Sequence, residues 1–182
     1  TGTTKLGAEG WAVTVQSGDA DTVNDDKDFG NYTTAKVSGV KFEDLDADGA
    51  DQEAGEPGLN GWTIYAFDAG VDGVLSQEEY DAQIITTDPV YSTITATVSS
   101  VDGVYSFDLP PGKYVICELI GDQTDWTQSY PSAGANCDYG TGTTKLGAEG
   151  WAVTVQSGDA DTVNDDKDFG NYTTAKVSGV KF

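Results

Sequence analysis

An acidic stretch from Asp68 to Glu79 has the residue types and the spacing of a calcium-binding loop. In such a loop, oxygen ligands recur at alternate positions, a glycine at position six permits a sharp turn, and the last glutamate binds through both oxygens. Gly70 stands where a side-chain ligand is usual, so water would replace it. The expected ligands are Asp68, Asp72, the backbone carbonyl of Val74, Ser76 and Glu79. The alternative is a solvated acidic turn that caps a short helix.

A second acidic stretch, from Asp44 to Glu56, opens with carboxylates at alternate positions. Asp44, Asp46 and Asp48 match the first ligands of the same kind of loop, but the loop is one residue too long for its closing glutamate. Either Glu56 reaches in through a bulge or Glu53 substitutes for it. Because this many carboxylates in one short segment repel one another without a cation, we expect bound metal.

A third acidic cluster follows no known spacing. Asp159, Asp161 and Asp165 are its candidate ligands, and Asp19, Asp21 and Asp25 are their copies near the start of the chain. The alternative here is a solvated acidic loop. Hard oxygen ligands without His or Cys favour calcium over transition metals at all of these sites, so calcium is the expected cofactor.

Residues 1–42 recur letter for letter as residues 141–182. Such a repeat is typical of a tandem array, in which each unit meets a copy of itself. We therefore assign residues 1–32 to the last strands of a preceding repeat, 33–172 to a complete repeat, and 173–182 to the first strand of the next. The connecting residues 33–35 and 173–175 are few and contain no Gly or Pro, which predicts a restricted orientation between neighbours and a stiff rod.

The composition narrows the partners and the chemistry. The chain has 31 Asp and Glu against nine Lys, a net charge of −22, and neither Arg nor His, which argues against nucleic-acid binding. A hydrophobic content of 37% is too high for a disordered acidic tail. No signal peptide or membrane-spanning run is present, so we expect any such segment outside residues 1–182 and no membrane insertion within them. Without His, Arg or a free nucleophilic Cys, we expect no enzyme activity.

Cys117 and Cys137 are the only cysteines, and no CxxC motif or His accompanies them. This argues against zinc and predicts a disulfide formed in an oxidising compartment. The alternative is a pair of buried thiols that do not meet.

The secondary structure is predicted to be nearly all β, because every strong segment alternates between apolar and polar residues and is bounded by turn residues. One short helix is expected over Ser76–Gln83, with Ser76 and Glu79 forming a capping box. An Asp-Gly pair at Asp102–Gly103 predicts a two-residue hairpin turn. The strand number suits an immunoglobulin-like sandwich. The predicted strands are Lys36–Glu43, Trp62–Phe67, Thr93–Ser99, Val104–Leu109, Lys113–Leu119, Trp151–Gln156 and Asp168–Tyr172.

Three segments carry a family resemblance: VSGVKFEDLDADG with GEPGLNGWTIYAFD, DGVYSFDLPPGKYVICE, and the closing DFGNY. Together they resemble the B-type repeats of serine-aspartate-repeat surface proteins and, more distantly, the B-type domains of collagen adhesins. The resemblance covers essentially one whole repeat. It implies the B-type topology of an immunoglobulin-like β-sandwich, calcium binding, and a stalk role on a microbial surface.

The same resemblance implies a candidate isopeptide bond. Some collagen-adhesin-type domains join a Lys of the first strand to an Asn or Asp of the last strand beside a buried carboxyl group, and the matching residues here are Lys41, Asn171 and Glu118. A desolvated Lys is a competent amine nucleophile, and a protonated Glu can polarise the amide. Against this, strand alternation places Lys41 on the opposite face from Val40 and Phe42, as in an ordinary strand Lys near an acid.

Two functions follow as hypotheses. The first is a structural repeat of a long extracellular fibre or cell-surface stalk, stiffened by calcium and a disulfide, whose partners are neighbouring identical repeats and fibres alongside. The second is an adhesin module that binds a host, matrix or cell-surface ligand. An adhesive face would need exposed aromatic residues, for which Trp126, Tyr130 and Tyr139 are the candidates. The alternative is that these residues pack over a sheet edge.

Overall fold

The computed structural model describes residues 10–18, 20, 26–85, 91–175 and 177–181. The chain divides into two units, Thr1–Asn31 and Tyr32–Phe182. The described residues of the first unit form neither helix nor strand. The helices and strands of the described residues lie in the second unit.

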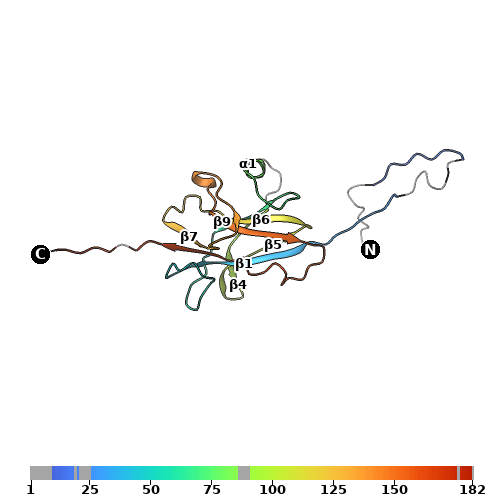
Figure 1. Cartoon of the computed structure of the whole chain (residues 1–182). Helices are drawn as coiled ribbons and strands as arrows, with labels where there is room; N and C mark the ends of the chain where they lie inside the picture. The colour runs from blue at the N-terminus through green and yellow to red at the C-terminus, as the bar shows by residue number, and fades with distance from the viewer. Residues whose placement is uncertain (1–9, 19, 21–25, 86–90, 176, 182) are drawn as a thin grey trace. The chain divides into compact units, whose positions relative to one another are not determined.

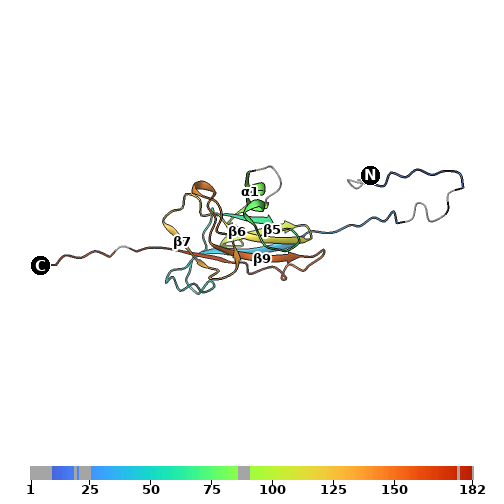
Figure 2. The same cartoon turned by 45° about the horizontal axis from the view of Figure 1, so that its top comes forward.

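Two five-stranded sheets pack face to face as an immunoglobulin-like sandwich, which confirms the predicted fold class (Figures 1 and 2). A parallel ladder joins β1 and β10 at the centre of the first sheet, whereas the other pairings are antiparallel. The first sheet has the order β4 (Ala96–Val98), β5 (Val101–Leu109), β1 (Ala35–Glu43), β10 (Phe169–Thr173), β7 (Trp126–Tyr130). The second has the order β3 (Tyr91–Ile94), β2 (Thr63–Asp68), β6 (Gly112–Glu118), β9 (Glu149–Val155), β8 (Ala135–Asn136).

The main core fills the space between the sheets, because alternate residues of each strand point inward. Its largest members are aromatic side chains of both sheets, and Tyr105, Phe107, Tyr114 and Phe169 are among them. A second cluster covers the outer face of β2 and β6, where Phe67 and Val115 meet Leu75, Tyr80 and Leu146. Strand β6 is thus buried on both faces from Tyr114 onward.

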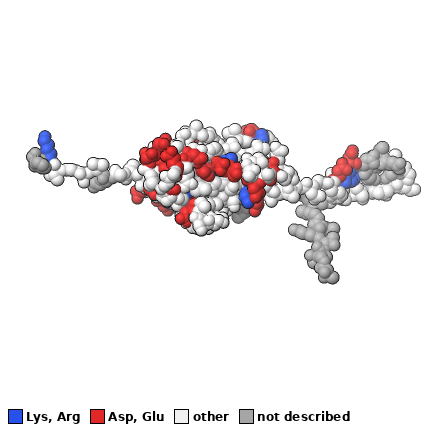
Figure 3. All heavy atoms as spheres, turned by 90° about the horizontal axis from the view of Figure 1, so that it is seen from below, with Lys and Arg blue, Asp and Glu red and all other residues white. Residues whose placement is uncertain are grey.

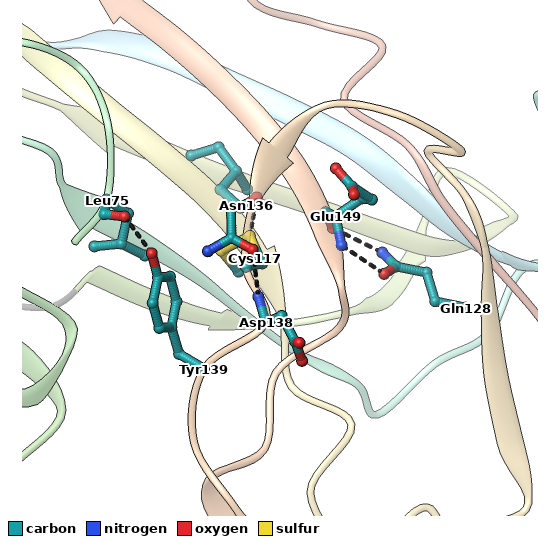
Figure 4. The surroundings of a disulfide bond; sticks show 9 residues. Leu75, Cys117, Gln128, Asn136, Asp138, Tyr139 and Glu149 are labelled. Carbon is teal, nitrogen blue, oxygen red and sulfur yellow. Dashed lines mark hydrogen bonds between the residues drawn. A yellow bond between two sulfur atoms is a disulfide. The ribbon is translucent and has the colours of Figure 1, made fainter. Parts of the chain in front are cut away.

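The predicted disulfide is confirmed. Cys117 of β6 bonds to Cys137, which follows β8, and both residues are fully buried in the second cluster. Figure 4 shows the side chains around this bond, including the Gln128 amide, which bonds to both the N–H and the carbonyl of Glu149. The disulfide therefore ties the edge strand β8 and the loop after it to a central strand.

The segment predicted as one strand over Thr93–Ser99 is two strands that belong to different sheets. The chain breaks at Thr95, whose hydroxyl donates to the Leu59 carbonyl and accepts from the Trp62 N–H. The prediction of a hairpin turn at Asp102–Gly103 is also wrong. Val98 pairs with Val101, so Ser99 and Ser100 form the turn, both with positive φ.

The predicted helix is present as α1 (Gln77–Ile85), after the expected cap. The Ser76 hydroxyl accepts from the Glu79 N–H, and the Glu79 carboxylate accepts from the Ser76 N–H, which is the reciprocal pattern of a capping box. A short 3₁₀ turn, η1 (Gly142–Thr144), lies between β8 and β9. Within the described residues, no helix has the length and apolar character that a membrane crossing requires.

Candidate functional site

A buried polar triad lies between the two sheets, formed by Lys41, Glu118 and Asn171. Lys41 comes from β1, Asn171 from the adjacent β10, and Glu118 from the end of β6 in the facing sheet. All three residues have no exposed surface. The sequence resemblance named these residues, and the fold brings them together.

The alternation argument against Lys41 was wrong. Inward-facing residues of β1 are those in step with Ala35 and Val37, and Lys41 is in step with them, whereas Val40 is only half-buried. Phe42 is also fully buried, so both faces of β1 are covered near its end. The pattern around Val40 and Phe42 therefore did not reveal the core face.

The Lys41 amine is enclosed by polar atoms on one side and an aromatic ring on the other. Its Nζ lies 3.2 Å from Glu118 Oε2 and donates to the Phe169 carbonyl at 3.2 Å. The same nitrogen lies 4.5 Å from the centre of the Trp62 ring, and Trp126 packs edge-on against that ring. These two indoles shield the amine from solvent. The sequence signal for Trp62 was its place at the start of a predicted strand, but nothing in that signal pointed to Lys41.

Hydrogen bonding within the triad is incomplete. Neither carboxyl oxygen of Glu118 has a well-directed hydrogen bond, and neither the oxygen nor the nitrogen of the Asn171 amide has a partner. A buried polar group without a partner costs roughly 1–3 kcal/mol. Because native proteins pair nearly all such groups, two of them side by side, the Glu118 carboxyl group and the Asn171 amide, indicate a functional site.

Burial also changes the charges of the triad. Desolvation lowers the pKa of Lys41 to about 8, although the nearby Glu118 opposes this shift. Desolvation likewise raises the pKa of Glu118, against the effect of Lys41. Both shifts favour the uncharged forms, so the site can hold a neutral amine beside a protonated carboxyl group. That pair has the protonation states for attack of an amine on an amide.

Two glycines allow the backbone to approach this site closely. A Cβ on Gly170 would lie 2.6 Å from Phe42 Cζ, and the register of β10 against β7 shifts just after it, between Gly170 and Asn171. Gly103 has φ of 77°, and a Cβ there would lie 2.1 Å from the Lys41 carbonyl oxygen. Neither position accepts a larger residue without movement of β1 or its neighbours.

A candidate metal centre lies outside the sandwich core, in the loop after β1. Asp44, Asp46 and Asp48 each offer a carboxylate oxygen, and these atoms lie within 4.8 Å of one another. Asp44 is buried and accepts from the N–H groups of Ala47 and Gly49. Burial opposes its ionisation, but the Ser129 hydroxyl and these backbone donors prevail and lower its pKa. A carboxylate held ionised in a converging group can bind a hard cation.

Glu56 and Glu53 occupy different positions in this loop. The Glu56 carboxylate reaches back and accepts from the N–H groups of Leu45 and Glu53. Glu53 is exposed, and the negative charges of Asp48 and Asp46 raise its pKa. Glu56 thus organises the loop backbone, while Glu53 experiences the field of the aspartates.

The acidic residues of the other two clusters bond to separate partners. Asp68 and Asp72 accept from the N–H groups two residues ahead, of Gly70 and Val74, and Glu79 bonds to Ser76. Asp159 accepts from the Gln156 N–H, Asp161 pairs with Lys36, and the Asp165 carbonyl accepts from Lys167. Within the described residues, only the Asp44 group converges. Asp19, Asp21 and Asp25 lie outside those residues. Figure 3 shows acidic side chains spread over one face of the second unit.

The three candidate aromatic residues are half-buried and packed against other rings. Trp126 contacts Trp62, Tyr130 contacts Phe42 and Trp151, and Tyr139 stacks on Tyr80. The Tyr139 hydroxyl also donates to the Leu75 carbonyl (Figure 4). These contacts favour the packing alternative over an adhesive face.

Solved structures with a similar fold include three Gram-positive pilins. The shaft pilin SpaA from Lactobacillus rhamnosus GG shares 16% identity at a TM-score of 0.40, over 79% of this chain and 51% of its own. The minor pilin GBS52 of Streptococcus agalactiae shares 15% at 0.35, over 83% and 49%. BcpA, the major pilin subunit of Bacillus cereus, shares 12% at 0.34, over 78% and 31%.

The chain spans about half the length of the first two pilins and less of BcpA. No model of a protein family matches the chain, and no curated protein matches it.

Proposed function

We propose that this chain is a structural module of an extracellular fibre or cell-surface stalk, held together by a covalent bond between Lys41 and Asn171. The single observation that carries the proposal is the burial of Lys41 and Asn171, on the adjacent first and last strands, beside Glu118 of the facing sheet. A neutral amine, an amide and a protonated carboxyl group enclosed together are the reactants for isopeptide formation.

The chemistry needs no cofactor. The lone pair of the neutral Lys41 Nζ attacks the amide carbon of Asn171, forming a C–N bond, while Glu118 shares its proton with the amide oxygen and stabilises the tetrahedral intermediate. Collapse breaks the bond to the Asn171 nitrogen, which takes the proton that the Lys41 nitrogen loses and leaves as ammonia. The shielding by Trp62 and Trp126 keeps water from competing for the amide carbon.

The position of this bond suits a protein under tension. Since β1 and β10 run parallel and adjacent, the chain enters β1 at one end of the sandwich and leaves β10 at the other (Figure 1). Tension along the chain therefore pulls β1 and β10 in opposite directions and shears the ladder between them. A Lys41–Asn171 bond joins these two strands directly, so the force passes through a covalent link instead of backbone hydrogen bonds.

Intact mass under reducing conditions tests the crosslink. The wild-type chain is expected to be lighter than its sequence by one ammonia, and Glu118→Gln is expected to slow formation by about 10²–10⁴-fold. Glu78→Gln, a change at an exposed residue of α1, serves as the matched control and should keep the deficit. A folded wild-type chain whose mass equals that of its sequence, with no loss of ammonia, would overturn the proposal.

We also propose that the Asp44, Asp46 and Asp48 group binds calcium, with Glu56 holding the loop. The converging carboxylates support this, and extracellular calcium modules typically bind at about 10⁻⁴–10⁻³ M. A chelator is expected to lower the melting temperature of the wild type but not of Asp46→Asn. Asp122→Asn, an exposed loop residue, is the control. Equal chelator sensitivity in all three proteins would contradict the site.

The setting of the module is part of the same proposal. Exact recurrence of residues 1–42 supports a tandem array whose partners are identical repeats, and the Cys117–Cys137 disulfide supports an extracellular location. The packed aromatic residues give the adhesin alternative no specific support.

A further inference from the structure

A bulge in β7 places a second side-chain amide beside the buried triad. Gly170 of β10 pairs with Tyr130 of β7. The next residue of β10, Asn171, pairs with Gln128, so Ser129 is the extra residue of the bulge. Because residues directly opposite each other in an antiparallel pair project from the same face, Gln128 points toward the facing sheet with Asn171.

The Gln128 amide is hydrogen-bonded through both of its ends. Its Nε2 donates to the Glu149 carbonyl at 2.8 Å, and its Oε1 accepts from the Glu149 N–H at 2.9 Å (Figure 4). Gln128 belongs to the first sheet, and Glu149 begins β9 in the second. This pair of bonds, the Gln128 clasp, therefore joins the two sheets at the end of the sandwich that contains the triad.

The segment that the clasp holds lies over Glu118. Residues 147–149 form this segment, here called the cover. The N–H of Gly147 donates to the Glu118 carbonyl at 3.0 Å. A Cβ on Gly147 would lie 2.8 Å from Gln128 Oε1 and 2.9 Å from Glu118 Cγ. Gln128 and Glu118 thus contact the same buried glycine, with no room for a side chain between them.

The disulfide attaches the cover to the second sheet. The Cys137 N–H donates to the Ala148 carbonyl at 2.9 Å, and Cys137 is bonded to Cys117, the residue before Glu118. The cover is therefore held to β6 through the disulfide and to β7 through the Gln128 clasp.

We propose that Gln128 is a positioning residue of the crosslinking site, which holds the cover over Glu118 and so keeps water away from its carboxyl group. The inference rests on the proposed function. Gln128 itself takes no part in the covalent step, because both ends of its amide are bonded to Glu149. Its effect passes through Glu118, whose protonated form depends on exclusion from water.

Gln128→Met tests this role, because methionine has a similar length and removes both bonds of the clasp. A full chain kept unfolded in guanidinium since its recovery from inclusion bodies has not crosslinked, so dilution starts folding and crosslinking together. Loss of ammonia is followed by intact mass under reducing conditions, and folding by tryptophan fluorescence. Once folded, Gln128→Met is expected to crosslink about 10²-fold more slowly than wild type.

Gln83→Met is the matched control. Gln83 Oε1 accepts from the Asp68 N–H and its Nε2 donates to the Asp68 carbonyl, both at 2.8 Å. Gln83 is half-buried like Gln128, but it lies on α1, outside the space between the sheets. This change removes the same two kinds of bond, so it should destabilise the fold to a similar extent and leave the crosslinking rate unchanged.

A double-mutant cycle shows whether Gln128 acts through Glu118. In a Glu118→Gln background, the carboxyl group that the cover protects is absent. Adding Gln128→Met there should slow the remaining reaction less than about 3-fold. Equal slowing in both backgrounds would mean a general effect on strand packing and would overturn the positioning role.

Hydrogen exchange separates this inference from the proposed function. If wild type crosslinks and Gln128→Met reacts as fast as Gln83→Met, the positioning role is overturned while the proposed function stands. If wild type forms no crosslink, the proposed function fails, and exchange at the Gly147 amide reports on the cover instead. That amide should exchange about 10-fold faster in Gln128→Met than in Gln83→Met, because the clasp is lost. Equal exchange in the two variants would overturn the inference in that case.

Discussion

The charge state of Lys41 decides what the buried triad can do. As an ammonium facing a carboxylate, it would form a buried ion pair, whose desolvation cost commonly exceeds its Coulomb energy. Burial shifts both Lys41 and Glu118 toward their neutral forms, against the effect that each has on the other. The same burial that makes the pair a poor salt bridge makes the amine a nucleophile.

A pair of acidic residues, Asp51 and Asp168, makes the stability of the protein depend on pH. The Asp168 carboxylate accepts from the Val40 N–H at 2.6 Å, yet its pKa is raised to about 6, first by burial and then by the nearby Asp51. In the sequence, Asp168 begins a predicted strand and follows the third acidic cluster. Its proximity to Asp51 links the Asp44–Glu56 loop to the residue before β10 and depends on tertiary structure.

The Asp51–Asp168 contact predicts that stability falls with rising pH between about 4 and 6. In this window the folded protein keeps a proton that the unfolded chain releases, and above it the buried carboxylate carries its full cost. Asp51→Asn removes a nearby negative charge and should reduce the loss by on the order of 1 kcal/mol. Urea unfolding from pH 4 to pH 7 measures this, with the exposed Asp125→Asn as control. Parallel curves for wild type and Asp51→Asn would contradict it.

At the scale of elements, the two copies of one glycine offer a matched comparison. Gly170→Ala should destabilise the protein by about 1–3 kcal/mol, because the new Cβ would press on the Phe42 ring and Tyr130. Gly30→Ala is the same change in the same local sequence, with nothing within 4 Å of its Cβ, and should leave stability unchanged. Chemical denaturation of both variants measures the difference. Equal effects would mean that the two copies share one environment.

The alternation of apolar and polar residues was sufficient to predict the long strands, but not the short strands at the edges of the sheets. The sequence Val104–Leu109 alternates between apolar and polar residues, and the structure forms strand β5 over it. The Thr93–Ser99 run alternates just as well, yet Thr95 bonds to the backbone at Leu59 and Trp62 and sends its two halves to different sheets. Strands β7 and β8 lack a strong apolar pattern, because each pairs with only one neighbour. Where a strand breaks, and which sheet each part joins, depends on contacts between residues far apart in the sequence.

Of the two candidate sites, one could be predicted from local spacing in the sequence and the other could not. The alternate aspartates from Asp44 to Asp48 converge because their spacing is local, so the sequence predicted that group directly. The triad joins residues of three strands, and only the family resemblance indicated it. Local alternation argued against Lys41, because Phe42 is buried on the other face of the same strand.

At the scale of the whole second unit, the parallel pairing of the first and last strands governs how force enters it. Both strands lie at the centre of one sheet, and their outer ends point in opposite directions. Without a crosslink, tension would shear the ladder between them and then unravel the sheets. With the Lys41–Asn171 bond, residues 42–170 lie outside the path of the force.

Single-molecule pulling from the two ends of the second unit tests this path. Wild type is expected to show no extension from residues 42–170 at forces that unfold Lys41→Ala, because the bond carries the tension. The disulfide provides an internal control, since it closes a loop of sequence separation 20 inside that region. Reductant should therefore lengthen the Lys41→Ala trace by that loop and leave wild type unchanged. A wild-type trace that lengthens with reductant would show that force reaches Cys117 and Cys137, and that β1 and β10 are not joined.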